Sequence, residues 1–281
     1  MSQEESREQV ETTEVETCYL HPDTPTKLRC SRCDRPICGR CAIPASVGQH
    51  CPECVAEARR SQRKVRSVTA ATAPATATIV ALCVGLFILQ RIDFDVTRRL
   101  ASIPAEIADG ELWRLVTPMF LHAPNFIFHI LFNMIVLWVY GPNVEQAFGT
   151  ARYVAMYLLA GFFAGATSYA FGPCNALGVG ASGAIFGIVG VLIVYAYNRR
   201  TSQFVKQYLR NLAAFVGINM VFGLVIPGVD VWAHGGGLAA GLLLGYGLDE
   251  RPAAMQLATL AAVGGLAIAL VVWRTATFVC G

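Results

Sequence analysis

Charge is scarce over most of this chain. Only 15% of its 281 residues are charged, and 54% are hydrophobic. A soluble domain usually carries about 25% charged residues, so the composition excludes a uniformly soluble protein. The formal net charge of +3 is also too small to favour nucleic acid as a partner.

The charges that are present are unevenly distributed. Residues 1–66 contain 11 Lys and Arg and 10 Asp and Glu, whereas the remaining 215 residues contain only 11 and 9. This contrast predicts a small polar module followed by a membrane domain. We expect no secretory signal peptide, because residues 1–16 are polar and acidic and are typical of a disordered tail.

Long uncharged stretches follow residue 66, and a membrane helix needs about 20 mostly apolar residues. The sequence therefore predicts a polytopic all-α membrane protein with seven helices, six in one block and one appended. They are expected in the second part of 67–90, from residue 126 within 115–144, on either side of a Gly-Pro turn at 171–178 within 153–198, and in 211–229, 231–248 and 252–273.

Lys and Arg in short loops mark the cytoplasmic side of a membrane protein. One basic cluster precedes the first helix and another lies between the fourth and fifth: Arg59, Arg60, Arg63, Lys64, Arg66, Arg199, Arg200, Lys206 and Arg210. We therefore expect a cytoplasmic N-terminus and a C-terminus on the opposite side of the cell membrane. The loop at 91–114 then faces outward, although it carries four arginines of its own. Cys174 and Cys280 also face the oxidising side, and the sequence leaves open whether they pair.

Seven of the ten cysteines fall between Cys18 and Cys54. With two histidines they form four close pairs: Cys18-x2-His21, Cys30-x2-Cys33, Cys38-x2-Cys41 and His50-Cys51-x2-Cys54. A two-residue gap lets a tight turn present both ligands to one tetrahedral zinc ion. A disulfide framework is the alternative for a secreted segment, but the basic run before the first helix favours the reducing cytoplasm. Two ions need eight of the nine candidates, so His50 or Cys51 is expected to be spare.

The order of these pairs resembles a B-box or RING-like cross-braced zinc finger. The resemblance implies that Cys18, His21, Cys38 and Cys41 share one ion, and that Cys30, Cys33, Cys51 and Cys54 share the other. A site closed by four protein ligands has no open coordination position, so we expect structural zinc without a catalytic role. Binding of a protein partner and a structural cap on the membrane domain are both open as roles for the finger.

Strongly polar residues inside membrane helices are costly and are candidates for function. Ser182 and His234 begin two helices that run in the same direction, at similar depth. Small residues at four-residue spacing let the two helices approach closely; they are Gly183 and Gly187 on one helix, and Gly237, Gly241 and Gly245 on the other. A histidine in such a position can take the proton of a serine nucleophile.

His129 and Asn133 are four residues apart and share one face of their helix. Both side chains can donate hydrogen bonds to a developing oxyanion. A polar clasp between helices is the simpler reading. A metal site is a third possibility, although no carboxylate or cysteine accompanies the pair.

Together these residues resemble the rhomboid family of intramembrane serine proteases, over residues 77–248. The seventh helix matches the 6+1 members of that family. Five motifs occur in the family's order: Glu111-Leu-Trp113-Arg114, His129-x3-Asn133, Glu145-x3-Gly149, Gly180-x-Ser182-Gly183 and Ala233-His234-x2-Gly237-x3-Gly241.

The resemblance implies that Ser182 is the nucleophile and His234 the general base, in a dyad without an acidic third member. It also implies that His129, Asn133 and the backbone N–H of Ser182 stabilise the oxyanion. Two positions depart from the family pattern. Phe186 stands where a tyrosine often stacks on the catalytic histidine, and His122 lies seven residues before His129 instead of about five, so we assign His122 no role.

We therefore expect an endopeptidase that cleaves transmembrane segments of membrane proteins within the lipid bilayer. The fifth helix, at 212–226, is the candidate lateral gate. The rivals are a catalytically silent scaffold that recruits partners through its zinc finger, and a solute transporter, which would show internal repeats. The expected parts are an acidic tail (1–16), the finger (17–56), a basic linker (57–76), the rhomboid core (77–250) and the extra C-terminal helix (251–281).

Overall fold

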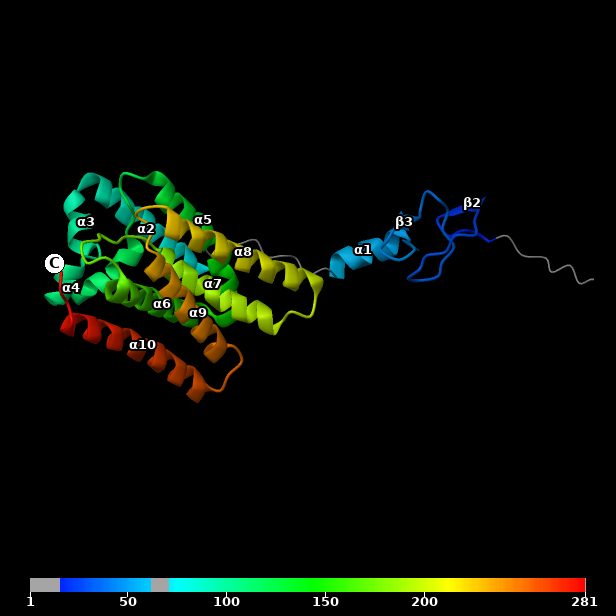
Figure 1. Ribbon diagram of the computed structural model, residues 1–281. Helices are drawn as coiled ribbons and strands as arrows, with labels where there is room; N and C mark the ends of the chain where they lie inside the picture. Colours follow the sequence, from blue (N-terminus) through cyan, green and yellow to red (C-terminus); the bar gives the residue numbers. More distant parts are fainter. Residues whose placement is uncertain (1–15, 62–70, 281) are drawn as a thin grey trace, which may run out of the picture. The chain divides into compact units, whose positions relative to one another are not determined.

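The computed structural model describes residues 16–61 and 71–280 (Figure 1). The chain divides into two compact units, residues 1–66 and 67–281. Apart from Glu16, the predicted acidic tail lies outside the described residues, and so does the 62–70 part of the predicted linker.

The first unit contains two small antiparallel sheets and one helix. β1 (Thr17–Cys18) pairs with β2 (His21–Pro25), β3 (Ile43–Pro44) pairs with β4 (Gln49–His50), and α1 (Pro52–Ser61) follows. Its buried core consists of six cysteines and Ile37. So small an apolar core cannot stabilise a fold without cross-links or metal. Helix α1 runs to Ser61, five residues past the predicted end of the finger.

The second unit is a bundle of long helices, and the predicted all-α membrane fold is confirmed. A helix is present at each of the seven expected places: α2 (Pro74–Ile92), α5 (Ile127–Phe148), α6 (Thr150–Phe171), α7 (Ser182–Asn198), α8 (Gln203–Val225), α9 (Val231–Leu248) and α10 (Ala253–Ala276). Among the described residues, five of these helices are long and apolar enough to cross a membrane, and α7, with 17 residues, is a shorter apolar helix.

Helix α8 begins about two turns earlier than the sequence suggested, at Gln203 instead of residue 211. The side chain of Ser202 caps it by accepting a hydrogen bond from the backbone N–H of Val205, 3.2 Å away. Lys206 and Arg210, which we expected in a loop, therefore belong to the first turns of this helix. Their charges still mark the same end of the bundle.

The loop at 91–114 is more ordered than the sequence indicated. It contains α3 (Phe94–Leu100), α4 (Pro104–Ala108) and the short helix η1 (Leu112–Leu115), and η2 (Thr117–Phe120) follows. The buried Arg114 holds it together. Its guanidinium donates to the carbonyls of Arg98 at 2.7 Å and Ala101 at 2.8 Å, and its Nε contacts the carboxylate of Glu111 at 2.5 Å. The Trp-Arg motif thus has a structural role here.

Helix α7 is the centre of the bundle, and every residue from Gly183 to Leu192 is buried. It packs most extensively against α9. A Cβ built on Gly237 would lie 2.0 Å from the carbonyl oxygen of Gly183. The two backbones are therefore in direct contact, as the small-residue spacing predicted.

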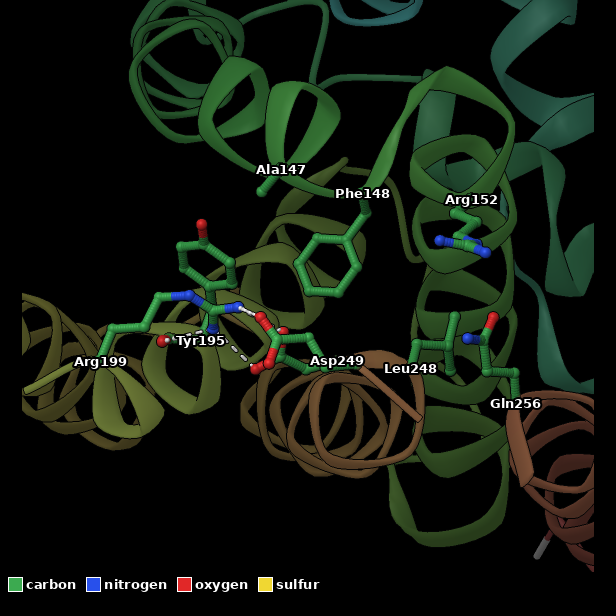
Figure 2. A pocket seen from close by; sticks show the side chains of 9 residues that line it. Ala147, Phe148, Arg152, Tyr195, Arg199, Leu248, Asp249 and Gln256 are labelled. Carbon is green, nitrogen blue, oxygen red and sulfur yellow. Dashed lines mark hydrogen bonds and ion pairs between the residues drawn. The ribbon is translucent and has the colours of Figure 1, made fainter. Parts of the chain in front are cut away.

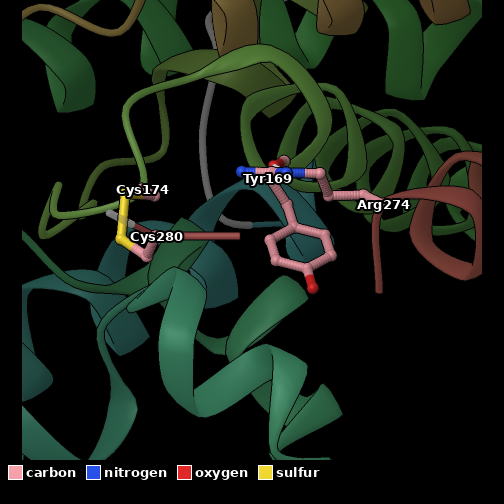
Figure 3. Close-up of a disulfide and its surroundings, with 4 residues drawn as sticks. All are labelled: Tyr169, Cys174, Arg274 and Cys280. Atoms are coloured by element: carbon pink, nitrogen blue, oxygen red, sulfur yellow. Dashed lines mark hydrogen bonds between the residues drawn. A yellow bond between two sulfur atoms is a disulfide. The ribbon is translucent and has the colours of Figure 1, made fainter. Parts of the chain in front are cut away.

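Helix α10 packs on α6 and α9, and a disulfide joins its C-terminal extension to the loop after α6 (Figure 3). Cys174 and Cys280 form this bond, which the sequence left open. Beside it, the Tyr169 hydroxyl contacts the Thr275 hydroxyl at 3.1 Å, and Arg274 Nε donates to the Tyr169 carbonyl at 3.3 Å. The appended helix is therefore fastened at the end of the bundle where α7 begins.

Candidate active site

Ser182 and His234 come together at the start of α7 and α9. Ser182 is the first residue of α7, and His234 lies in the first turn of α9. The Oγ of Ser182 and the Nε2 of His234 are 2.9 Å apart, which is hydrogen-bonding distance. Because Gly183, next to Ser182, touches Gly237, three residues after His234, this distance is fixed by the helix packing.

Gly180 brings His129 to the same place. Its φ of +139° is a backbone conformation that side-chain-bearing residues rarely adopt. A Cβ at this position would lie 2.9 Å from Nε2 of His129 and 3.6 Å from Oγ of Ser182. The N–H of Gly180 donates to the Pro118 carbonyl at 3.0 Å, which anchors the chain just before the serine. The absent side chain leaves space between the serine and the His129 ring.

The environment of His129 determines which ring nitrogen carries the proton. Its Nδ1 accepts a hydrogen bond from the backbone N–H of Ala123 at 3.2 Å. In the neutral ring the proton must then be on Nε2, the atom that faces Gly180. His129 is therefore a hydrogen-bond donor toward the region beside Ser182.

The side chain of Asn133 is engaged by the backbone of its own helix. Its amide donates to the backbone carbonyl of His129, four residues earlier, at 2.7 Å. Within residues 16–61 and 71–280 it makes no hydrogen bond to Ser182 or His234. An amide has two N–H groups, so one donor remains for another acceptor.

The His234 ring is oriented by stacking. Phe186, one turn after Ser182 on α7, lies parallel to it with ring centroids 4.4 Å apart and an interplanar angle of 10°. Phe186 thus supplies the stacking surface at the position where the resembled family often has a tyrosine. The other ring nitrogen, Nδ1, is buried and has no hydrogen-bond partner among the described residues. The serine and histidine therefore form a pair without a carboxylate in contact.

Asp230 is a residue near the site that the sequence analysis missed. It precedes α9, and its Oδ1 accepts a hydrogen bond from the backbone N–H of Ala233 at 2.9 Å. Its Oδ2 accepts a hydrogen bond from the Ser168 hydroxyl on α6. An aspartate immediately before an apolar helix is a recognisable N-cap signal, so the sequence contained the information needed to identify this role.

Glu145 belongs to a motif that the sequence analysis quoted without a role. Its buried carboxylate accepts hydrogen bonds from the N–H groups of Ala75 and Thr76, both at 2.9 Å, and from the hydroxyls of Thr76 and Thr150 at 2.8 and 3.0 Å. A carboxylate is favourable at a helix N-terminus because of the helix dipole. Glu145 therefore joins the start of α2 to the junction of α5 and α6.

The opposite ends of α7 and α9 are joined by an ion pair (Figure 2). Arg199 Nη1 and Nη2 contact the two carboxylate oxygens of Asp249 at 2.8 and 3.0 Å, and Nη2 contacts Glu250 at 2.6 Å. These residues line a cavity of about 410 Å³, together with Arg152 and Gln256 on its other side. The cavity lies at the far end of α7 from Ser182, so it is separate from the candidate active site.

The cysteines of the first unit form two separate groups of potential metal ligands. One contains Cys18, His21, Cys38 and Cys41, and the other contains Cys30, Cys33, Cys51 and Cys54. Within each group the ligand atoms all lie within 4.8 Å of one another, and His50 belongs to neither. These are the two sets that the cross-braced resemblance implies, and their donor types suit zinc.

The thiols of these groups differ in their tendency to ionise. Burial raises the pKa of Cys41 to about 11, and a hydrogen bond with Cys51 raises that of Cys54 to about 12. Burial raises the pKa of Cys18, but hydrogen bonds from the backbone at Cys38 and from His21 outweigh it and lower the pKa to about 6. In the same way, backbone hydrogen bonds outweigh burial and lower the pKa of Cys30 to about 6. The thiolate is the form that binds metal, so backbone hydrogen bonds favour metal binding at Cys18 of one group and at Cys30 of the other.

Comparison with known proteins gives a consistent family. A sequence model of the rhomboid domain matches residues 109–251. The chain is 39% identical over 135 residues to "Rhomboid protease GluP" of Bacillus subtilis, which covers 48% of this chain and 26% of that protein. It is 34% identical over 142 residues to "Putative rhomboid protease YdcA" of the same organism, covering 50% and 69%. It is 32% identical over 171 residues to "Rhomboid-like protease 1" of Toxoplasma gondii, covering 58% of each.

Proposed function

Because this multi-pass membrane protein belongs to the rhomboid family, we propose that it is an intramembrane serine endopeptidase. Its substrates are membrane proteins, which it cleaves in or beside a transmembrane segment. The 2.9 Å contact between Ser182 Oγ and His234 Nε2 carries this proposal, because it pairs a nucleophile with a base inside a bundle of apolar helices.

The first chemical step transfers the serine proton. Ser182 Oγ attacks the scissile carbonyl carbon, and Nε2 of His234 takes the hydroxyl proton. The tetrahedral intermediate collapses when the C–N bond breaks and the imidazolium returns that proton to the leaving amine. A water molecule then attacks the acyl-enzyme by the same route, with its proton passing through Nε2, and releases the new carboxyl group.

The negative charge on the carbonyl oxygen meets preorganised donors. The backbone N–H of Ser182 is at the first position of α7, where a helix offers no acceptor of its own. The Nε2–H of His129 faces the same region across Gly180. Donors of this kind contribute about 3–4 kcal/mol each to stabilising the transition state. Asn133 contributes its remaining N–H and is the weaker member, since its amide is partly engaged by His129.

The N-terminal finger binds two structural zinc ions, one in each four-ligand group. Both groups have the donor number and type of closed tetrahedral sites. Zinc supplies the cross-linking that the small apolar core cannot, and catalysis by Ser182 requires no metal.

We place the N-terminus in the cytoplasm and the C-terminus outside the cell membrane. The helix ends with Arg199, Arg200, Lys206 and Arg210 then face the cytoplasm, as the positive-inside rule requires. The disulfide between Cys174 and Cys280 lies at the other end of the bundle, which faces the oxidising compartment. Water reaches Ser182 from that side.

The test is cleavage of a tagged single-span reporter protein in proteoliposomes. Wild type is compared with Ser182→Ala, His234→Ala and the remote control Gly265→Ala, whose added methyl group has nothing within 4 Å. We expect both active-site variants to lose cleavage while the control retains it. Cleavage that survives Ser182→Ala would disprove the assignment, and an inactive wild type that no serine-reactive probe labels would indicate a silent scaffold.

A further inference from the structure

The proposed general base has no acidic partner on its second ring nitrogen. Nδ1 of His234 is buried and lacks a hydrogen-bond partner among the described residues. When Nε2 takes the proton of Ser182, the ring becomes an imidazolium in a buried position. An unpaired buried charge is strongly disfavoured, so a fixed negative charge nearby stabilises the transition state in addition to the oxyanion that forms with it.

Asp230 lies one helical turn before His234 and accepts three hydrogen bonds. Its backbone carbonyl accepts a hydrogen bond from the N–H of His234 at 3.1 Å. One carboxylate oxygen caps the N–H of Ala233, and the other is bonded by the hydroxyl of Ser168. Because Ser168 is on α6, the aspartate fastens the first turn of α9 to a neighbouring helix.

The charged surroundings of the His234 ring are simple. Asp230 is bonded through its backbone to His234, and His129 Nε2 faces the region beside Ser182, which His234 contacts. His129 is a neutral donor in the proposed reaction, and its protonation would oppose a second positive charge. The carboxylate of Asp230 is therefore the group in this part of the structure that attracts the imidazolium.

We propose that Asp230 is a positioning residue for the proposed reaction. It holds His234 at hydrogen-bonding distance from Ser182 by capping α9 and tying it to α6, and its charge stabilises the imidazolium without touching the ring. This inference rests on the proposed protease function. The negative charge that stabilises the imidazolium then comes from the N-cap residue of α9. No carboxylate hydrogen-bonded to Nδ1 of His234 is required.

Asp230 could stabilise the site only by capping α9, or also by its negative charge. Substitutions that keep the cap but change the charge distinguish these two roles. Asparagine caps a helix about as well as aspartate, but it carries no charge. Asp230→Asn therefore keeps the hydrogen bond from Ala233 and removes the charge. In place of Oδ2 it presents an amide NH2, which donates to the Ser168 hydroxyl instead of accepting from it. Asp230→Ala removes both the cap and the charge.

The experiment measures kcat, KM and thermal stability of the full chain in proteoliposomes, on a single-span reporter. We expect Asp230→Asn to lower kcat on the order of tenfold, with KM and the unfolding temperature close to wild type, since a unit charge one turn away is lost. Asp230→Ala lowers kcat further and also lowers the unfolding temperature. Glu250→Gln removes an equal charge at the other end of α9, where the side chain is 82% exposed, and serves as the matched control with wild-type kcat.

Substitutions of Ser168 provide a second test of the role of Asp230. Ser168→Ala is expected to lower kcat several-fold, and Ser168→Thr to restore it, because threonine keeps the hydroxyl that bonds Asp230. Wild-type kcat in Asp230→Asn would overturn the proposed charge role. If Ser182→Ala abolishes cleavage in that same series, the protease function stands and only the role of Asp230 falls.

Discussion

Gly241 of α9 lies against the backbone of Gly187 of α7, so closely that a Cβ on Gly241 would be 2.0 Å from the Gly187 carbonyl oxygen. This contact is one turn beyond the matching contact of Gly237 with Gly183. At the two ends of the same helix pair stand the Ser182–His234 hydrogen bond and the Arg199–Asp249 ion pair. The Ser182–His234 distance therefore depends on backbone contact along the length of α7 and α9.

Gly241→Ala tests this dependence. The added methyl group meets a backbone atom, which cannot rotate away, so the helices must separate. We expect a loss of about 1–3 kcal/mol in stability, as for other overpacked cores, and a fall in cleavage of at least tenfold. The measurement is thermal unfolding in detergent together with the reporter assay. Gly217→Ala on α8, where nothing lies within 4 Å, is the control, and equal behaviour of the two variants would contradict the prediction.

The Arg199–Asp249 pair gives stability a defined pH dependence. Burial raises the pKa of Asp249, but hydrogen bonds from Arg199 and Asn198 outweigh it and lower the pKa below its ordinary value of 3.8. A depressed pKa contributes stability that is fully present above pH 4 and is lost as the pH falls through the folded-state value. Asp249→Asn should therefore have a lower unfolding temperature than wild type at pH 7. Below pH 4 the two unfolding temperatures should approach each other.

Glu250→Gln is the matched control for Asp249→Asn. Its carboxylate contacts the same arginine but is 82% exposed, so solvent screens the interaction. We expect an unfolding temperature close to wild type at every pH. An effect as large as that of Asp249→Asn would show that burial is not what makes the Asp249 contact strong.

The two ligand groups of the finger predict a zinc stoichiometry of two per chain, measured by elemental analysis of the purified protein. Cys38→Ser should remove one ion and Cys51→Ser the other, because each group holds its own four ligands. His50→Ala should keep both, since His50 lies on β4 and in neither group. A zinc content of one in wild type, or a loss of zinc in His50→Ala, would refute this partition.

Helix α8 contains the segment that the sequence analysis named as a lateral gate. Cross-linking α8 to α5 tests this role. Among the described residues of α8 only Leu212 and Gly223 are buried, so this helix is loosely packed. The rings of Tyr140 on α5 and Phe215 on α8 are 5.7 Å apart. Cross-linking a Tyr140→Cys, Phe215→Cys variant should abolish cleavage of a membrane-embedded reporter if the substrate enters between these helices.

The matched controls are the two single-cysteine variants treated with the same reagent. Each carries the reactive group without the link, so each should keep its activity. Cleavage that persists in the linked protein would mean that substrate enters elsewhere. Restored cleavage after reversal of the link would exclude damage to the fold.

The sequence alone was enough to predict the class of fold and the pairing of Ser182 with His234. Apolar stretches must be long enough to cross a bilayer, so seven helices could be placed from composition. Glycines at four-residue spacing predicted which two helices touch: Gly183 and Gly187 on one, and Gly237, Gly241 and Gly245 on the other. Because these features are local and periodic, Ser182 and His234 could be paired before their distance was known.

The contacts between distant segments became visible only in the folded chain. The joining of Cys174 to Cys280, the binding of Asp230 to Ser168 and the capping of α2 by Glu145 connect residues at least 62 positions apart. No periodicity in the chain encodes such pairs, because they depend on how whole helices settle against one another. The proton position on His129 was hidden for the same reason, since it is set by a backbone N–H whose direction follows from the folded loop.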